Sequence, residues 1–287
     1  MAAAISERQT AARAQPRPRR ATEDAGVSAV PTALQNKHAL VTGGARGIGL
    51  AISRMLLENG ARVTMLGRDA KKLEASAREM AKLGEIACAS ADVTDANAVA
   101  EAFSQARSGF GPIQILVNNA GQAGSAPFLK TDAKLWRQMM SVNLDGTLHC
   151  TQVALPDMLS AGWGRIVNIA SVAGLRGAPY ISAYCASKHA VIGLTRALAL
   201  EVAAKGITVN AVCPGYTDTD MVELAVANII KKTGRTGEEA RAELASHNPQ
   251  KRLVQPEEVA NAALWLCLPG SEAITGQAIV VAGGEAS

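Results

Sequence analysis

The stretch His38–Gly49, HALVTGGARGIG, decides the fold of this chain. Its first five residues are strand-like, and its glycines lie in the turn that follows and at the start of a helical pattern over Gly47–Asn59. Glycines in such a turn let backbone N–H groups approach a pyrophosphate at the helix N-terminus. The spacing is GxxxGxG, so the strand–turn–helix context carries the prediction, and an ordinary Gly-rich turn is the alternative. We predict a dinucleotide site that includes Gly43, Arg46, Gly47, Ile48 and Gly49.

Outward from this stretch, strand-like runs alternate with longer helical patterns. A second predicted helix covers Ala70–Leu83. The predicted strands are His38–Thr42, Arg62–Leu66, Ile86–Ser90, Ile115–Asn118, Arg165–Ile169, Thr208–Cys213 and Ala278–Val281. Such alternation predicts an α/β fold, a Rossmann-like, doubly wound parallel sheet with helices on both faces. We expect one domain over residues 37–287, with a mobile helical lid at about 218–250.

Residues 1–36 differ from the remainder in composition. Five arginines stand against one acid between Ser6 and Arg20, and no apolar periodicity is present. We interpret this segment as a disordered basic leader. It also resembles an organelle transit peptide, while a bacterial extension or a start codon placed too early is the alternative. We expect a cytoplasmic protein, with import through the leader as the other possibility.

The bulk composition argues against several classes of protein. The formal net charge is +4, much of it in the leader, so we expect no nucleic-acid partner. No apolar run approaches a membrane span, and the four histidines form no metal-ligand pattern, so we expect neither a membrane nor a metal. The five cysteines have no CxxC spacing and suggest buried thiols in a reducing compartment.

The candidate chemistry lies between Ser171 and Lys188. Tyr184 follows Ser171 by thirteen residues, and Lys188 follows Tyr184 by four. Residues at i and i+4 share one face of a helix. An ammonium there favours phenolate, so we expect it to lower the tyrosine pKa from about 10 toward neutrality. With the serine hydroxyl holding a substrate oxygen, this set predicts carbonyl reduction or alcohol oxidation.

The choice between NAD and NADP depends on the end of the second strand. Asp69 lies twenty residues beyond Gly49, about where an acid would bind a ribose 2′-hydroxyl and select NAD. It also directly precedes a helix and is a candidate N-cap. Arg68, assisted by Arg46, is suited to a 2′-phosphate. We favour NADP, with NAD as the alternative.

From about His38 to its end, the chain resembles the short-chain dehydrogenase/reductase family in its compact single-domain branch. Each motif is weak alone, but their order and their places at strand ends are specific. They are the glycine loop, Asp92-Val93, Asn118-Asn119-Ala120-Gly121, Asn143, Ser171, Tyr184-Cys185-Ala186-Ser187-Lys188 and Pro214-Gly215. No catalytic position departs from the family pattern.

The resemblance implies roles for individual residues. Tyr184 would be the general acid/base, Lys188 would bind the nicotinamide ribose, and Ser171 would orient the substrate carbonyl. Asn143 would hold a water that links Lys188 to solvent, although a role in a helix kink is the alternative. The implied cofactor contacts are Asp92 and Val93 at the adenine, Asn118 and Ala120 at the adenosine ribose, and Pro214, Gly215, Thr217 and Thr219 at the nicotinamide. Asn118 and Asn119 have an alternative role in stabilising the strand end.

The substrate is less clear from the sequence. The sequence segments around Ser171 and Pro214 resemble those of 3-oxoacyl thioester reductases, polyketide ketoreductases and 3-hydroxyacyl-CoA dehydrogenases. Basic residues in and beyond the lid suit a CoA- or carrier-linked substrate or simply a solvated helix face; they are Lys231, Lys232, Arg235, Lys251 and Arg252. We predict a 3-oxoacyl/3-hydroxyacyl thioester; the alternatives are a small secondary alcohol, a sugar alcohol or a steroid, and remotely a non-catalytic dinucleotide sensor. The resemblance also implies a homotetramer.

Overall fold

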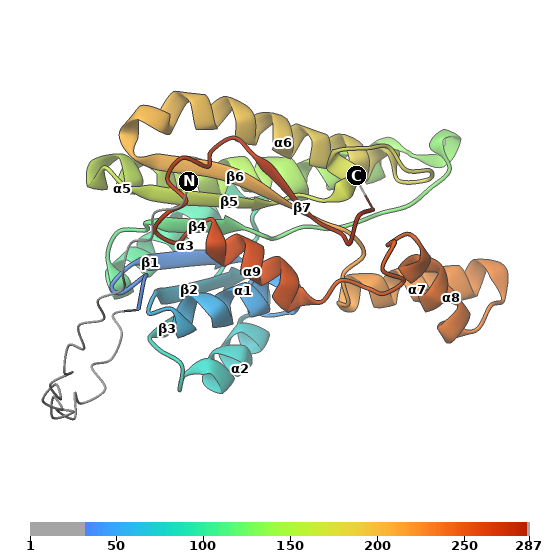
Figure 1. Cartoon of the computed structure of the whole chain (residues 1–287), viewed down its shortest axis with the longest axis horizontal. Coiled ribbons are helices and arrows are strands. Elements are labelled where there is room, and N and C mark those ends of the chain that lie inside the picture. The colour runs from blue at the N-terminus through green and yellow to red at the C-terminus, as the bar shows by residue number, and fades with distance from the viewer. Residues whose placement is uncertain (1–31, 286–287) are drawn as a thin grey trace, which may run out of the picture. The chain divides into compact units, whose positions relative to one another are not determined.

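A computed structural model describes residues 32–285 of the chain. Its centre is a seven-stranded sheet with the order β3-β2-β1-β4-β5-β6-β7, in which every neighbouring pair is parallel (Figure 1). The strands are β1 His38–Thr42, β2 Arg62–Gly67, β3 Ile86–Ser90, β4 Ile115–Asn118, β5 Gly164–Ile169, β6 Ile207–Pro214 and β7 Ala278–Val281. The predicted doubly wound α/β fold is confirmed.

Helices cover both faces of the sheet, because successive strand residues point to opposite sides. Val41 of β1 joins one apolar cluster and Leu40 joins the other. One layer holds α1 Gly47–Glu58, α2 Ala70–Met80 and α9 Pro256–Trp265. The other holds α3 Ala96–Phe110, α5 Gly146–Ala161 and α6 Ser182–Val202, with α4 Ala133–Met140 against α6. Burial of each Leu or Phe side chain in these layers stabilises the fold by about 1.5–3 kcal/mol.

The strand order places the candidate site. Chain succession reverses between β1 and β4, and parallel strands end at one common edge, so a crevice opens outside their carboxyl ends. The glycine loop follows β1, and Asn119 follows β4. Ser171 follows β5 by two residues, and Gly215 follows β6 directly. Residues far apart in the sequence therefore meet at one edge of the sheet.

The interval predicted as a lid contains two helices, α7 Asp220–Thr233 and α8 Gly237–Ser246. They pack on each other through a small apolar cluster of their own, which includes Val222, Val226, Ala240 and Leu244. Figure 1 shows this pair set apart from the two helix layers. The mobility of the pair stays a prediction.

The folded unit begins earlier than residue 37. Leu34 is buried, and its backbone N–H donates to the carbonyl of Asn59 at 3.0 Å. Arg62 donates to the side chain of Asn36 at 3.0 Å. The boundary predicted at residue 37 is therefore too late, because residues 32–36 are tied to the loop between α1 and β2 and to the start of β2. The remainder of the predicted leader lies outside the described residues.

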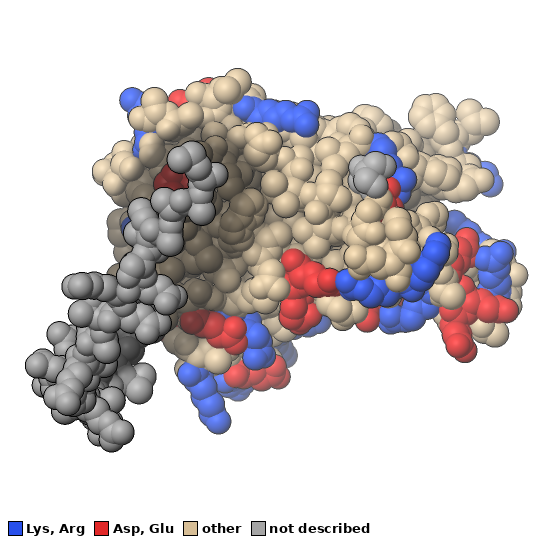
Figure 2. Space-filling model, viewed as in Figure 1, with Lys and Arg blue, Asp and Glu red and all other residues tan. Residues whose placement is uncertain are grey.

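Across residues 32–285, none of the helices combines the length and the apolar character that crossing a membrane requires. The same residues contain no group of three or more His, Cys, Asp or Glu arranged to hold a metal ion. On the face drawn in Figure 2, acidic and basic side chains are intermixed along the lower edge, without a single basic field.

Candidate active site

The glycine loop between β1 and α1 has a shape that side chains would prevent. Gly43 has φ +64°, and a Cβ there would lie 2.9 Å from Nδ2 of Asn119. A Cβ on Gly49 would lie 2.3 Å from the Gly43 carbonyl oxygen. Arg46, at the N-cap of α1, makes no side-chain capping bond. The first-turn N–H groups of α1 and the bare loop backbone therefore fit the pyrophosphate of a dinucleotide.

Hydrogen bonds clamp the ends of β1 and β4 together. The Thr42 hydroxyl accepts bonds from the backbone N–H groups of Asn119 and Ala120, each at 2.9 Å. Nδ2 of Asn119 donates back to the carbonyls of Thr42 at 2.9 Å and Gly43 at 3.2 Å. Asn119 thus stabilises the strand end, which was the alternative that the sequence left open.

The side chain of Asn118 turns into the core. Its Nδ2 donates to the Thr151 hydroxyl at 3.0 Å and to Oδ1 of Asn168 at 2.9 Å. Asn168 continues this polar chain to the Thr195 hydroxyl at 2.9 Å. The network links β4 and β5 to α5 and α6, so the Asn118 side chain has a structural role. Its contact with the adenosine ribose stays a prediction.

The cations near the end of β2 are paired with acids. Arg46 lies 3.2 Å from Asp220, the first residue of α7, and Nζ of Lys72 lies 3.7 Å from the same carboxylate. Arg68 lies 3.6 Å from Asp92. All three cations are at least 46% exposed, so an incoming phosphate has access to them. Both arginines predicted for a 2′-phosphate therefore lie at this end of the crevice.

The acids at the same end differ in role. Oδ1 of Asp69 accepts from the backbone N–H of Lys72 at 3.1 Å, which makes Asp69 the N-cap of α2. Partial burial tends to raise the pKa of Asp92, but hydrogen bonds from Thr94 and the charge of Arg68 hold it below its ordinary value. Asp92 is therefore ionised at neutral pH. Val93, the next residue, is buried against Gly146 of α5.

Tyr184 and Lys188 occupy successive turns of α6. Nζ of Lys188 lies 5.9 Å from the centre of the Tyr184 ring and donates to the Ile169 carbonyl at 2.7 Å. Ile169 ends β5, and Ser171 follows two residues later to open a short 3-10 turn, Val172–Gly174. The Ser171 hydroxyl accepts from the backbone N–H of Ala173 at 3.1 Å. The structure brings the three predicted residues together.

The electrostatics of this trio differ from the expectation. Burial raises the pKa of Tyr184, and a hydrogen bond with the Ser171 side chain partly offsets that effect. Burial also lowers the pKa of Lys188 to about 8, against a smaller opposing influence of Cys213. The expectation of a lowered tyrosine pKa is thus wrong for this geometry, because loss of water on burial is the largest influence on the phenol.

Asn143 lies in a π-helical turn, Ser141–Asp145, between α4 and α5. Its Nδ2 donates to the Gln122 carbonyl at 3.0 Å and to the Ser187 hydroxyl at 2.9 Å, and its Oδ1 accepts from the Gln122 N–H at 2.9 Å. π-turns of this kind are frequent at functional sites. A Cβ on Gly121 would lie 3.1 Å from Oδ1 of Asn143 and 3.6 Å from Nζ of Lys188, so these three residues border one small space.

The residues predicted beside the nicotinamide follow β6. The Thr217 hydroxyl donates to the Gly215 carbonyl at 3.0 Å, and the Thr219 hydroxyl donates to the Thr217 carbonyl at 3.2 Å. A Cβ on Gly47 would lie 3.0 Å from the Thr219 methyl group, so this segment covers the glycine loop. Pro214 is the last residue of β6. Thr219 therefore lies against the glycine loop, and the contacts of this segment with the nicotinamide stay a prediction.

Sequence reasoning missed several residues that hold the site. Gln122 and Ser187 fix Asn143, and the Ile169 carbonyl fixes Lys188. Ser187 stands within the quoted Tyr184–Lys188 motif, so a signal was present there. Arg176 pairs with Glu285, which lies 109 residues away, and no local pattern announces that contact.

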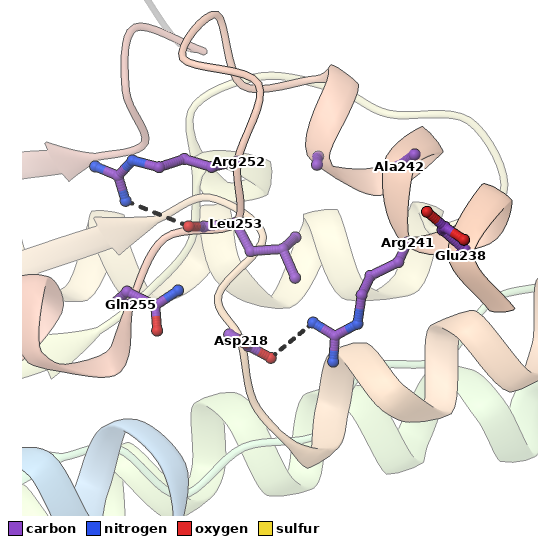
Figure 3. A pocket seen from close by; sticks show the side chains of 8 residues that line it. Asp218, Glu238, Arg241, Ala242, Arg252, Leu253 and Gln255 are labelled. Carbon is purple, nitrogen blue, oxygen red and sulfur yellow. Dashed lines mark hydrogen bonds and ion pairs between the residues drawn. The ribbon is translucent and has the colours of Figure 1, made fainter.

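A hollow of about 350 Å³ lies elsewhere, between α8 and the segment before α9 (Figure 3). Its cations are already paired: Arg241 with Asp218 at 2.9 Å and with Glu223, and Arg252 with Glu258 at 2.6 Å. None of the predicted catalytic residues lines it. The crevice at the strand ends, and not this hollow, brings the reactive groups together.

The fold and this crevice define a dinucleotide-dependent oxidoreductase, and comparison with known proteins gives its family. The sequence model of the short chain dehydrogenase family matches residues 37–229. The chain belongs to the short-chain dehydrogenase family, and it is an NAD(P)-dependent enzyme that interconverts ketones and secondary alcohols.

Individual relatives bear out this class. A D-beta-hydroxybutyrate dehydrogenase of Rhizobium meliloti is 38% identical over 252 residues, covering 86% of this chain and 98% of the relative. A 3-oxoacyl-(acyl-carrier-protein) reductase of Aquifex aeolicus is 37% identical over 253 residues, with coverages of 88% and 98%. A crystal structure of an actinorhodin polyketide ketoreductase variant with NADPH matches at a TM-score of 0.85 and 38% identity, with coverages of 88% and 97%.

Proposed function

We propose that this chain reduces the ketone of a 3-oxoacyl thioester with NADPH, and that Tyr184, Lys188, Ser171 and Asn143 carry the proton chemistry. The observation that carries the proposal is the meeting of Tyr184 with Ser171, beside a glycine loop shaped for a pyrophosphate. A phenol that can donate a proton beside a second hydroxyl is suited to a carbonyl oxygen that gains negative charge.

The residues divide the work as follows. The nicotinamide supplies the hydride, and the protein supplies placement and protons. The hydroxyls of Ser171 and Tyr184 hold the carbonyl oxygen, and Tyr184 donates its proton to it. Lys188, with a pKa of about 8, holds a proton at neutral pH and releases it readily toward the phenolate. Asn143 keeps the space beside Lys188 in shape through its bonds to Gln122 and Ser187.

The cation cluster at the end of β2 supports NADPH over NADH. Arg46, Arg68 and Lys72 are exposed there, and guanidinium groups suit phosphate oxygens. The acid at this position that would otherwise select NAD, Asp69, is used as a helix N-cap. The test is kcat/KM with each cofactor. We expect at least a tenfold preference for NADPH, and an NADH preference would overturn this part of the proposal.

The relatives support a thioester substrate more strongly than the basic lid residues do. A carrier-linked 3-oxoacyl reductase and a polyketide ketoreductase align over nearly their whole lengths. Three of the basic residues have partners of their own: Arg235 pairs with Glu243, Lys251 bonds the Ser246 carbonyl, and Arg252 pairs with Glu258. They are correspondingly less available to a substrate phosphate.

A substrate panel tests the reaction. Purified protein is assayed with NADPH against acetoacetyl-CoA, an acetoacetyl carrier protein, small ketones, keto sugars and ketosteroids. We expect the highest kcat/KM with the thioesters. A higher kcat/KM with a keto sugar, a ketosteroid or a small ketone would show that the proposed thioester substrate is wrong. No turnover of any of these compounds would favour the non-catalytic dinucleotide sensor.

We also propose a homotetramer in the cytoplasm. Exposed leucines on α5 and α6 (Leu148, Leu159, Leu200) and the half-exposed Val280 on edge strand β7 support further burial between subunits. All five cysteines are free thiols, which supports a reducing compartment, with import through residues 1–36 as the alternative. Light scattering of the purified protein at micromolar concentration tests the tetramer, and a monomer would overturn it.

A further inference from the structure

An ion pair joins the loop after Ser171 to the segment that follows β7. Nη2 of Arg176 lies 2.5 Å from Oε1 of Glu285. The Glu285 side chain is only 4% exposed, whereas that of Arg176 is 48% exposed. The carboxylate is therefore held inside the protein, under a guanidinium that reaches solvent.

Both partners lie on the substrate side of the crevice. The backbone N–H of Arg176 donates to the Val172 carbonyl at 3.1 Å, directly after Ser171. A Cβ on Gly215 would lie 2.6 Å from Oε2 of Glu285. The pair thus spans the two strand ends, β5 and β6, between which we place the reacting carbonyl.

The charges of this pair act on Tyr216, a neighbour of the proposed catalytic Tyr184. Burial raises the pKa of Tyr216, the negative charge of Glu285 raises it further, and Arg176 acts in the opposite direction. Tyr216 in turn is one of the groups that raise the pKa of Tyr184. Tyr216 therefore lies between the ion pair and the reactive phenol.

Two buried polar atoms near this ion pair have no hydrogen-bond partner within the described residues. Within residues 32–285, no donor bonds Oε2 of Glu285, although that atom is buried. Nδ2 of the buried Asn248, which lies beside Gly283, likewise has no hydrogen-bond partner among these residues. A buried carboxylate oxygen without a partner is costly and needs an explanation other than stability.

We propose that Glu285 pairs with Arg176 from below, neutralises its charge and so makes the enzyme prefer neutral carboxyl derivatives, thioesters or esters, over free 3-oxo acids. An unpaired Arg176 beside the reacting carbonyl would bind a substrate carboxylate through two parallel hydrogen bonds. With Glu285 in place, the guanidinium charge is neutralised, and a free acid meets a like charge. A thioester carbonyl is uncharged and meets no such opposition. This inference rests on the proposed reaction and deepens it.

The experiment compares three substrates with NADPH: acetoacetate, its ethyl ester, and a cyclic ketone that carries no carboxyl group. The proteins are wild type, Glu285→Gln, Arg176→Gln and the double variant. Glu285→Gln preserves shape while it removes the charge, and we expect it to raise the acetoacetate/ester ratio of kcat/KM by about tenfold or more. Arg176→Gln and the double variant should lose that gain, because the anchor for the carboxylate is gone.

Matched controls separate this effect from general damage. Glu85→Gln also removes a carboxylate that faces an arginine, Arg62 at 3.1 Å, but at the far end of the sheet, so its ratio should equal that of wild type. An unchanged ratio in a folded Glu285→Gln protein would overturn the inference, as would equal loss with all three substrates. Should Glu285→Gln not fold, Glu285→Ala makes the same comparison.

The cyclic ketone distinguishes failure of the proposed substrate from failure of the inference about Glu285 and Arg176. Wild-type protein that reduces the cyclic ketone better than the ester contradicts the proposed substrate. The ratio of kcat/KM for acetoacetate to that for the cyclic ketone in Glu285→Gln still decides whether Glu285 neutralises Arg176.

Discussion

The ammonium of Lys188 lies 2.7 Å from the Ile169 carbonyl oxygen and 5.9 Å from the centre of the Tyr184 ring. One carbonyl at the end of β5 therefore positions the lysine, while the helix positions the phenol. Lys188 is buried and Tyr184 is partly buried, and this loss of water raises the pKa of the tyrosine and lowers that of the lysine to about 8. Burial favours the neutral form of each group, and the pair is suited to passing one proton between them.

Replacement of the phenol tests the proposed acid. Tyr184→Phe should lower kcat by at least about 10²-fold, because positioned proton transfer contributes roughly 10²–10⁴-fold. Tyr180→Phe is the matched control, since Tyr180 is 66% exposed and its change is chemically identical. Turnover is read with NADPH, and circular dichroism checks the fold. Near-normal turnover by the Tyr184 variant would refute its role.

The pH dependence follows from the two perturbed groups. Tyr184, with a raised pKa, stays protonated through the neutral range, whereas Lys188 loses its proton near pH 8. We expect kcat/KM for reduction to fall above about pH 8, as the lysine no longer supplies a proton, and oxidation to accelerate over the same interval. Both directions are measured from pH 6 to 10. Reduction that speeds up between pH 7 and 9 would contradict this assignment.

The glycine loop gives a prediction on stability and affinity together. Gly43→Ala should cost about 1–2 kcal/mol for its left-handed backbone alone, and the close approach to Asn119 adds to that cost. Gly162→Ala is the control, because Gly162 has φ +61° and no atom within 4 Å of a Cβ. Thermal unfolding should show a smaller loss for Gly162, and only the Gly43 variant should lose NADPH affinity. Equal effects would mean that the loop is not packed as described.

Asp220 gives a prediction on cofactor choice. Its carboxylate pairs with both Arg46 and Lys72, so a 2′-phosphate has to compete with it. Asp220→Asn should tighten NADPH binding by about two- to fivefold, because an exposed ion pair is worth roughly 0.2–1 kcal/mol. NADH binding should stay unchanged. Asp218→Asn, which removes a carboxylate paired with Arg241, is the control. Parallel changes for both cofactors would rule out competition at the phosphate.

The fold was predictable because its signals are local. Glycines at 43, 47 and 49 follow a strand, and alternating apolar runs gave strand positions that agree with the structure to within one residue. The Tyr184–Lys188 spacing is local as well, since it depends only on the helix repeat.

The partners of the site residues were not predictable. Arg46 meets Asp220 across 174 positions, and Arg176 meets Glu285 across 109. The tyrosine pKa was predicted in the wrong direction because its largest influence is loss of water on burial, which no spacing reveals. The sequence left Asn118 between a cofactor contact and a structural role, and it did not reveal the polar chain that its side chain forms with Asn168 and Thr195.

The bonds between Thr42, Asn119 and Ala120 restrict how a dinucleotide reaches its place. They join the ends of β1 and β4, the two strands between which the strand order reverses. The base of the crevice is therefore rigid, and the two halves of the sheet do not move apart. Access then depends on the roof, formed by Thr219 and α7 above the glycine loop. We therefore predict that the rates of cofactor binding and release depend on movement of α7 and α8 and not on movement within the sheet.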